Sequence, residues 1–394
     1  MECNQQLTRK FKRGRIVKLI LLIAVVSYIV LHLLSNRSFP NTVQHIKTVH
    51  ENGSTGQVVS STSESINIAI VSCDHSGNSG SATLASVMIK SVLISAERFH
   101  ASSVHFFIFL EEAGTQKFIE NNVKEYGYSN GNKSVGARLH FHSVFDVVPK
   151  EHHRNFVISP AGPRCTFIRL FLSSYLLNVD QILYLDTDTI VTGDISKVWS
   201  HFKEMNAQQL IGIAPNSQPG PDFDNIHKTN FGGYPHVPPK GVNAGVVLMN
   251  LRKMRTIDWN QKILRAYNNY STVYNAVNDQ LLLNIYLHYE TGSRFLNLMP
   301  CKYNYMHVYC DHGQLCESVE EDAVGIHIVH GSGGQFFNKE KGLYPVHQVF
   351  KKVNISSQHI LKELRMSLQQ NFVDGANKPE CYKHLNRLFS KSFS

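Results

Sequence analysis

Two aspartates separated by one residue follow an apolar strand, and they are the clearest chemical signal in the sequence. The expected strand Gln181–Asp186 leads directly into Thr187 and Asp188. In an open α/β sheet, ligands bind at the carboxyl ends of the strands. Two carboxylates at that place can share a hard divalent cation, which takes oxygen ligands and can bridge to a diphosphate. The motif therefore predicts a metal and nucleotide site; the alternative is an aspartate-rich turn, with Asp194 capping the next helix.

The same spacing also occurs in phosphatases that form an aspartyl-phosphate intermediate. Residues 186–189 (DTDT) fit the D-x-D-x-T/V pattern of those enzymes. Such phosphatases usually have this strand first in the domain, and they need a downstream lysine and a pair of acids. Here three expected strands precede the motif, and no convincing acid pair follows it. A phosphatase is therefore the less favoured interpretation.

Apolar strands alternate with helical patterns around the motif. The expected strands are Ile66–Cys73, Val104–Leu110, Arg138–Val144, Gln181–Asp186 and Gln209–Ala214, and the expected helices lie near Leu84–Val92, Thr115–Tyr126, Thr166–Leu177 and Ile195–Phe202. This alternation predicts an α/β fold with a mostly parallel sheet covered by helices on both faces. Residues 215–241, rich in proline and glycine, predict a long functional loop over the sheet.

Four segments follow the aspartate motif in a fixed order. They are Gly241–Leu251 (GVNAGVVLMNL), Asn278–Asn284 (NDQLLLN), Leu298–Tyr305 (LMPCKYNY) and Ile326–Gly334 (IHIVHGSGG). Together with Arg169 in FIRLFL, this ordered set resembles glycosyltransferase family 8, which includes glycogenin. The resemblance runs from about Asn67 to about Phe350. Within the family, the P-C-x-Y-N-Y segment, the cysteines that follow it and the H-G pair are most similar to the glucoside xylosyltransferases.

The resemblance implies a GT-A fold, which is one doubly wound α/β domain with the nucleotide at the strand ends. It implies a divalent cation, most suitably manganese, held by Asp186, Asp188 and His330. It also implies a catalytic pair, Asp279 and Gln280, near the anomeric carbon. The expected donor-binding residues are Ser72, Asp74, Arg169, Thr187, Asn243, Ala244, Gly245, Gly331, Gly333 and Gly334.

Several of these residues have a structural alternative, and two positions depart from the family pattern. Arg169 on an apolar helix face is equally compatible with a buried structural arginine, and Asp279 with a helix-start residue. Leu281 stands where many members have a further acid. Phe336 replaces the lysine of the H-x-x-G-x-x-K-P-W pattern, so the β-phosphate would need another cation, such as Lys339 or Lys341.

The implied activity is a retaining transfer of xylose from UDP-xylose to O-linked glucose on epidermal-growth-factor-like repeats, as on Notch. Front-face attack is favoured because no closely spaced carboxylate pair demands a covalent intermediate. The alternatives are a family member with another UDP-sugar donor or acceptor, and a glycosyltransferase-like protein that binds a glycan without turnover.

The N-terminal residues predict a membrane anchor. Within residues 1–18, six basic residues and one acid contribute five of the nine net positive charges, and the apolar run Leu19–Leu34 follows. The positive-inside rule then places the N-terminus in the cytosol and the rest in the lumen. A cleaved signal peptide and a buried core helix are the less favoured alternatives. The remaining residues carry too little net charge to indicate a nucleic-acid partner.

The expected organisation is that of a single-pass type II membrane protein of the Golgi or endoplasmic reticulum. It comprises a cytosolic tail (1–15), a signal anchor (16–34), a flexible stem (35–65), one lumenal catalytic domain (66–381) and a C-terminal tail (382–394). An oxidising lumen would pair the six cysteines beyond the anchor, which are Cys73, Cys165, Cys301, Cys310, Cys316 and Cys381. Cys301, Cys310 and Cys316 are close enough in sequence to suggest a zinc site, but they lack the C-x2-C spacing of structural zinc sites, which favours disulfides. Five glycosylation sequons begin at Asn36, Asn52, Asn132, Asn269 and Asn354.

Overall fold

The computed structural model describes eleven stretches of the chain. They are residues 43–46, 65–73, 80–101, 103–125, 135–156, 165–216, 236–238, 240–273, 277–311, 316–374 and 379–393. The chain divides into two units, Met1–Asn41 and Thr42–Ser394, and all described residues belong to the second. The expected anchor 16–34 and nearly all of the stem lie outside the described residues, as does most of the loop 215–241. Within the described stretches, no helix has both the length and the apolar character needed to cross a membrane.

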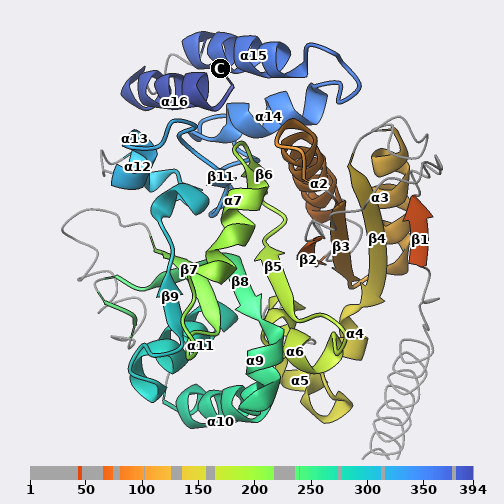
Figure 1. Cartoon of the computed structure of the whole chain (residues 1–394), viewed down its shortest axis with the longest axis vertical. Helices are drawn as coiled ribbons and strands as arrows, with labels where there is room; N and C mark the ends of the chain where they lie inside the picture. Colours follow the sequence, from red (N-terminus) through yellow and green to blue (C-terminus); the bar gives the residue numbers. More distant parts are fainter. Residues whose placement is uncertain are drawn as a thin grey trace, which may run out of the picture. The chain divides into compact units, whose positions relative to one another are not determined.

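A mostly parallel sheet of eight strands forms the centre of the second unit (Figure 1). Its strands, in spatial order, are β1 (Val43–Ile46), β4 (Gly136–Ser143), β3 (Ser103–Leu110), β2 (Ile66–Ser72), β5 (Gln181–Leu185), β8 (Val242–Asn250), β7 (Ile211–Pro215) and β9 (Leu296–Leu298). Strand β1 is antiparallel to β4, and β8 is antiparallel to both β5 and β7; the other pairs are parallel. The predicted α/β fold with a mostly parallel sheet is therefore confirmed.

Helices pack against both faces of this sheet, which explains why its strands are apolar on both sides. Ala69 of β2 and Phe107 of β3 belong to one large buried cluster that also contains Phe171 and Trp259 from the helical segments beyond β4. The alternate residues, such as Ile68, point to the opposite face, where α2 packs.

A second, three-stranded sheet positions residues that the sequence places far apart. It consists of β10 (Tyr305–Met306), β11 (Ile328–His330) and β6 (Thr189–Val191), in that order. Strand β6 follows β5 after the aspartate motif, and its antiparallel pairing with β11 sets His330 opposite Thr189. This register brings the end of β11 to the carboxyl end of β5.

The longer helices are α2 (Gly80–Arg98), α3 (Ala113–Glu125), α10 (Trp259–Ser271), α11 (Asp279–Ile285), α14 (Tyr344–Lys352), α15 (Ile360–Asp374) and α16 (Pro379–Ser392). The shorter ones are α4 (Val144–Val147), η1 (Lys150–His152), α5 (His153–Phe156), η2 (Cys165–Phe171), α6 (Leu172–Tyr175), α7 (Ile195–Ser200), η3 (His201–Lys203), α9 (Leu251–Thr256), η4 (Tyr286–Glu290), η5 (Cys301–Tyr303), α12 (Val308–Asp311) and α13 (Glu317–Glu320).

The segment expected as one helix near Thr166–Leu177 is a 3₁₀ helix, η2, followed by a short α-helix, α6. Side chains three residues apart in a 3₁₀ helix lie almost directly above one another. Thr166 and Arg169 therefore project to the same side, and both reach Asp279.

The C-terminal residues differ from the tail expected over 382–394. The expected boundary at Cys381 falls inside α16, and Leu385, Leu388 and Phe389 on this helix are buried. These residues recur at helical spacing, so they form an apolar stripe that packs against the preceding helices. The side chain of Arg98 also donates a hydrogen bond to the carbonyl of Ser392. Residues up to Phe393 are thus part of the folded unit.

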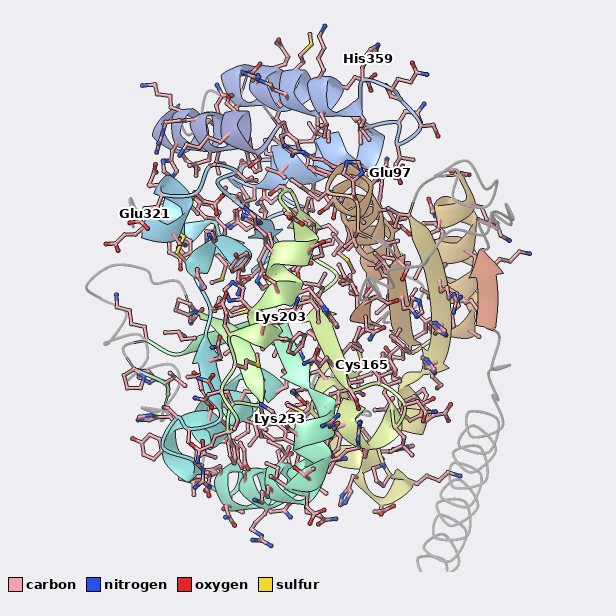
Figure 2. The ribbon with its side chains drawn as sticks, viewed as in Figure 1. Glu97, Cys165, Lys203, Lys253, Glu321 and His359 are labelled. Carbon is pink, nitrogen blue, oxygen red and sulfur yellow. A yellow bond between two sulfur atoms is a disulfide. The ribbon has the colours of Figure 1, made fainter. Side chains whose placement is uncertain are left out.

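Two disulfides are formed among the described residues, Cys73–Cys165 and Cys301–Cys316, and Cys381 is also disulfide-bonded. The preference for a disulfide over a zinc site is confirmed for Cys301 and Cys316. Figure 2 shows Cys165 inside the domain, whereas the polar side chains of Glu321 and His359 lie at its periphery.

Candidate active site

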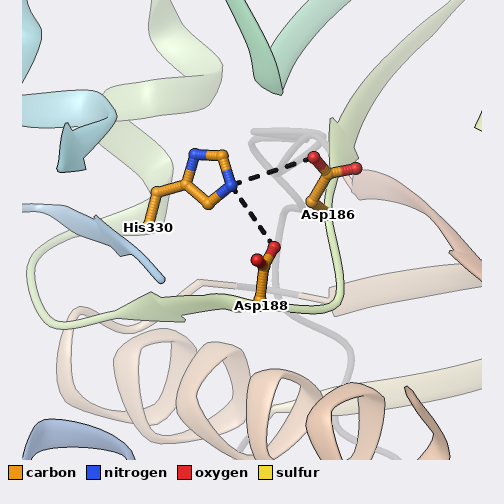
Figure 3. A group of neighbouring side chains, drawn as sticks. All are labelled: Asp186, Asp188 and His330. Atoms are coloured by element: carbon orange, nitrogen blue, oxygen red, sulfur yellow. Dashed lines mark ion pairs between the residues drawn. The ribbon is translucent and has the colours of Figure 1, made fainter. Parts of the chain in front are cut away.

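Asp186, Asp188 and His330 converge at the carboxyl end of β5 (Figure 3). One potential ligand atom from each lies within 4.8 Å of the others. His330 Nε2 is 3.3 Å from Asp188 Oδ1 and 3.9 Å from Asp186 Oδ2. The N–H of Gly331 donates to the carbonyl of Asp188 at 2.7 Å, which continues the β6–β11 pairing. Two carboxylates and one imidazole form a donor set that suits a divalent metal ion.

Gly245 leaves the space in which the imidazole of His330 lies. A Cβ atom on Gly245 would stand 2.2 Å from His330 Cε1, closer than any side chain tolerates. The carbonyl of Gly245 accepts a hydrogen bond of 2.8 Å from the N–H of Asp186. One residue of β8 thus holds the first aspartate by its backbone and admits the histidine ring because it has no side chain.

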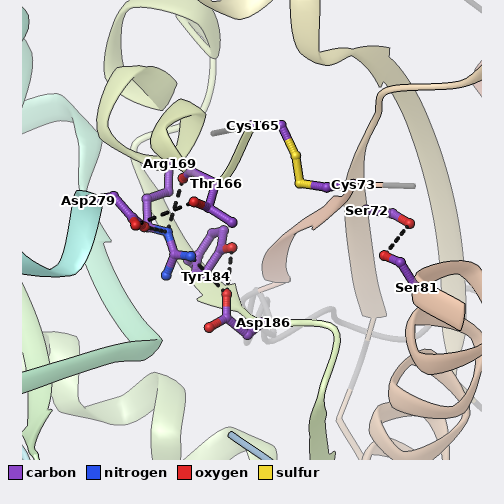
Figure 4. The surroundings of a disulfide bond; sticks show 9 residues. All are labelled: Ser72, Cys73, Ser81, Cys165, Thr166, Arg169, Tyr184, Asp186 and Asp279. Carbon is purple, nitrogen blue, oxygen red and sulfur yellow. Dashed lines mark hydrogen bonds and ion pairs between the residues drawn. A yellow bond between two sulfur atoms is a disulfide. The ribbon is translucent and has the colours of Figure 1, made fainter. Parts of the chain in front are cut away.

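Arg169 lies between the first aspartate of the motif and the predicted catalytic aspartate (Figure 4). Its Nη2 is 2.9 Å from Asp186 Oδ1, and its Nε is 2.7 Å from Asp279 Oδ2. Nη1 donates to the carbonyl of Ala244, and the guanidinium also stacks 4.1 Å from the ring centroid of Tyr184. The arginine is buried, so its planar group links three elements within the domain.

Burial and neighbouring charges shift the pKa values of these ionisable groups in opposite directions, and which effect is larger differs from group to group. Burial raises the pKa of Asp186, and this effect exceeds the lowering by Arg169. Burial also opposes ionisation of Asp188, but the charge and hydrogen bond of His330, together with a backbone hydrogen bond and Arg169, lower the pKa of Asp188 overall. Burial lowers the pKa of His330, whereas Asp188 raises it, with a net rise. Likewise burial lowers the pKa of Arg169, but its two carboxylate partners raise it overall.

The predicted catalytic pair begins helix α11, beside the start of β8. Asn278 caps this helix by accepting a hydrogen bond from Leu281 N–H at 2.7 Å. Asp279 forms an ion pair with Arg169, and Gln280 Oε1 accepts a hydrogen bond of 3.0 Å from the N–H of Ala244. The structure therefore brings the Asp-Gln pair next to the segment that contains Asn243, Ala244 and Gly245.

The other residues predicted to bind the sugar donor differ in their surroundings. The hydroxyl of Ser72 is buried and lies 2.8 Å from that of Ser81, so it points toward α2. Asp74 lies outside the described residues. Thr187 is half-buried between the two aspartates. Gly333 and Gly334 have φ values of 71° and 74°, and a Cβ on either would meet open space. Their backbone is thus exposed beside the site, in a conformation that favours glycine.

The phenylalanine that replaces the family lysine is a core residue. Phe336 is 1% exposed, and its ring stacks on His347 with centroids 5.2 Å apart. A Cβ on Gly331 would lie 2.6 Å from this ring, so the lack of a side chain at Gly331 leaves room for Phe336. Of the two alternative cations, Lys339 is exposed and Lys341 is half-buried. A lysine at position 336 would thus be enclosed rather than face a phosphate.

Three contributors to the site had no role assigned from the sequence. The Tyr184 hydroxyl donates a hydrogen bond of 2.8 Å to Asp186 Oδ1. Residues two apart in a strand lie on the same face, so this contact could have been predicted from the sequence. Asn304 lies within the LMPCKYNY segment and bonds to both Asn243 and His330. The Cys73–Cys165 disulfide joins the end of β2 to the start of η2, the helix that carries Arg169 (Figure 4).

Known proteins that resemble this chain are glycosyltransferases. Mouse (Mus musculus) glucoside xylosyltransferase 2 is 28% identical over 291 residues, which cover 70% of this chain and 59% of that protein. Human (Homo sapiens) glucoside xylosyltransferase 1 is 30% identical over 222 residues, which cover 52% of this chain and 48% of that protein. This chain thus spans between 48% and 59% of the length of these two relatives. The predicted likeness to the glucoside xylosyltransferases is confirmed.

Among solved structures, mouse xyloside xylosyltransferase 1 in its apo form superimposes with a TM-score of 0.49 and 19% identity. The match covers 69% of this chain and 99% of that one. The model of one family, described as glycosyl transferase family 8, matches residues 29–333, which is well over half of the chain. The chain therefore belongs to glycosyl transferase family 8.

Proposed function

We propose that this protein is a retaining, metal-dependent xylosyltransferase. The donor would be UDP-xylose, and the acceptor would be O-linked glucose on epidermal-growth-factor-like repeats of glycoproteins such as Notch. The observation that carries the proposal is the convergence of Asp186, Asp188 and His330 at the end of β5, with Arg169 bonded to the first of them. Family membership and the glucoside xylosyltransferase relatives support the choice of reaction and donor.

Asp186, Asp188 and His330 would hold the cation, most suitably manganese. When bound, this ion would neutralise the negative charge that develops on the departing UDP. Arg169 and Tyr184 both bond to Asp186 Oδ1, which leaves Oδ2 directed toward His330. The first aspartate is therefore already oriented before any ligand binds, which lowers the cost of assembling the site.

The residues near the expected sugar position favour front-face attack. Asp279 is ion-paired with Arg169, and Gln280 carries an amide, which is a poor nucleophile. In the proposed step, the acceptor hydroxyl bonds to C1 of xylose on the side from which UDP leaves. The bond between C1 and the β-phosphate oxygen breaks, and that phosphate oxygen takes the hydroxyl proton. Gln280 would line this site, and its side chain is held in place by the N–H of Ala244.

The proposed location is the Golgi or endoplasmic reticulum membrane, with residues 16–34 as a type II anchor and the stem 35–65 leading to a lumenal catalytic domain. The formation of disulfides among the described residues supports an oxidising compartment. A glycan-binding protein without turnover is the less favoured function, because the complete metal trio and its supporting arginine are retained.

A donor screen tests the proposal. Detergent-solubilised full-length chain would be supplied with Mn²⁺, a glucosylated repeat peptide and each of several UDP-sugars, and UDP release and peptide mass would be measured. We expect a mass increase of one pentose with UDP-xylose. UDP-glucose should react more slowly, because crowding against one extra hydroxymethyl group discriminates by about 1–3 kcal/mol. Faster turnover with UDP-glucose would overturn the xylose assignment and leave the family assignment intact.

A further inference from the structure

Asn304 lies between His330 and Asn243, and we propose that it is a positioning residue that turns the His330 ring so that Nε2 faces the two aspartates. Asn304 Oδ1 is 3.0 Å from His330 Nδ1, and Asn304 Nδ2 donates to Asn243 Oδ1 at 2.9 Å. Asn304, His330 and Asn243 are 0%, 3% and 7% exposed, respectively. This inference rests on the metal site of the proposed function.

One backbone N–H group fixes which partner donates in each of the hydrogen bonds that link Asn243, Asn304 and His330. The N–H of Gly245 can only donate, and it lies 3.0 Å from the side chain of Asn243, so the atom that it meets must be Oδ1. The same oxygen is met by Asn304, which must therefore present its NH₂ group there. The carbonyl oxygen of Asn304 then faces His330, and Nδ1 of the imidazole must carry the proton. Nε2 is left to face Asp186 and Asp188, with a lone pair available whenever the ring is neutral.

Asn304 is well placed to hold this orientation. Its N–H bonds to the carbonyl of Cys301 at 3.0 Å, and Cys301 is tied to Cys316 by a disulfide. The next residue begins β10, which is parallel to β11 and pairs Met306 with His330. Asn304 therefore directly precedes the strand that pairs with the end of β11, where His330 lies.

An asparagine suits this position because it offers one donor and one acceptor. A leucine of similar size offers neither and would leave both His330 Nδ1–H and one lone pair of Asn243 without a partner, at a cost in stability. An aspartate retains the acceptor toward His330 but loses the donor toward Asn243. Partners of this kind commonly change metal affinity by about 10–100-fold when they are removed from a metal-bound histidine.

The competing explanation is that Asn304 only satisfies buried polar groups and joins β8 to β10. That role predicts a loss of thermal stability in any variant, with no specific coupling to His330. Metal affinity, measured without donor or turnover, separates the two explanations, because it reports the geometry of the ligands directly.

The experiment measures Mn²⁺ binding to the purified full-length chain from the electron paramagnetic resonance signal of free Mn²⁺. The variants are Asn304→Leu, Asn304→Asp, His330→Ala and the double variant Asn304→Leu/His330→Ala, each with a melting temperature. Asn260→Leu is the matched control, since Asn260 also bridges two groups but lies on α10 and contacts Ser173 and Ser174.

We expect Asn304→Leu to weaken Mn²⁺ binding by about 10–100-fold. Asn304→Asp should remain closer to the unchanged protein, because it still accepts the Nδ1 proton, although both variants lose thermal stability. In the His330→Ala background, Asn304→Leu should cause no further loss of affinity, and Asn260→Leu should cause none in the unchanged background.

Three outcomes overturn the inference, and each differs from failure of the proposed function. Unchanged Mn²⁺ affinity in folded Asn304→Leu, or an equal loss with and without His330, would show that Asn304 does not act through the histidine. If Asn304→Leu does not fold, weaker binding by Asn304→Asp than by His330→Ala would contradict it instead. An unchanged protein that binds no Mn²⁺ would contradict the proposed metal site itself.

Discussion

The buried Arg169 forms an ion pair with the half-buried Asp186, in which Nη2 stands 2.9 Å from Oδ1, and this pair connects helix η2 to the first aspartate of the motif. Sequence alone was compatible with a structural arginine bound to either aspartate. The structure instead shows Arg169 in contact with both Asp186 and Asp279. The arginine therefore holds the proposed metal ligand and the proposed catalytic aspartate at a fixed separation.

Arg169→Gln should destabilise the domain by about 3–5 kcal/mol, because removing one partner leaves uncompensated buried charge. It also removes the charge that lowers the pKa of Asp186, so that pKa should rise further and Mn²⁺ binding should weaken. Urea unfolding and Mn²⁺ titration measure the two effects. The control is Arg387→Gln, whose exposed pair with Glu320 is expected to contribute at most about 1 kcal/mol. Equal effects of both substitutions would contradict the assigned role of Arg169.

Asp188→Asn should leave the fold intact and remove most transferase activity. The side chain keeps its size, but the proposed cation loses a charged ligand, and we expect a rate loss of roughly a hundredfold or more. Chelation should reproduce this loss in the unchanged protein, and added Mn²⁺ should restore it. Asp180→Asn is the control, because Asp180 lies on the surface with Arg252 and Arg255. A folded Asp188→Asn protein that binds Mn²⁺ normally and still transfers xylose would show that the site has been misplaced.

Gly245→Ala should weaken metal binding even in the protein that remains folded, because the added methyl would stand 2.2 Å from the His330 ring. The imidazole must then move away from Asp188, and Mn²⁺ titration should show weaker binding. Gly114→Ala is the matched control, since a Cβ there meets nothing within 4 Å. Its effect should be neutral or stabilising by about 0.4–1 kcal/mol. Equal Mn²⁺ affinities in the two variants would contradict the contact.

Stability should fall as the pH is lowered from about 6.5 to about 4, in part because of buried and half-buried histidines. Burial, with a smaller contribution from Lys351, lowers the pKa of His347 from 6.5 to about 4. Burial also lowers the pKa values of His105 and His142 to about 4. Because the folded state disfavours the protonated ring, the contribution is complete above the unfolded pKa and is lost as the pH falls toward the folded one.

His347→Phe should flatten this part of the pH profile, because phenylalanine keeps the stacking on Phe336 and does not titrate. The change for one histidine is at most about 3 kcal/mol between the two pH limits. Urea unfolding at several pH values measures it, and His359→Gln at the exposed position is the control. A profile that is equally steep in the His347→Phe protein would exclude His347 as a contributor.

The proposed lumenal orientation predicts glycosylation at Asn354, which is exposed just beyond helix α14. In microsomes, a glycosidase should shift the full-length chain on a gel, and Asn354→Gln should remove one glycan increment. Asn338→Gln, at an asparagine outside any sequon, should leave the pattern unchanged. An unglycosylated domain that external protease digests would contradict the orientation.

The local elements and the position of the aspartate motif could be predicted from residue patterns alone. Buried parallel strands need continuous apolar runs, so β2, β3 and β5 could be recognised within one or two residues of their observed ends. The ligand-binding edge followed from the rule that sites form at the carboxyl ends of such strands. The C-terminal helix was missed, although Leu385, Leu388 and Phe389 recur at helical spacing.

Which of these residues come into contact depends on strand register and packing. His330 reaches Asp188 through the register of β6 with β11, and Asn304 reaches His330 through the pairing of β10 with β11. The enclosure of Phe336 against His347 likewise depends on how α14 packs. Local propensity acts over a few neighbouring residues, whereas register and packing are set by the burial of surfaces that lie far apart along the chain.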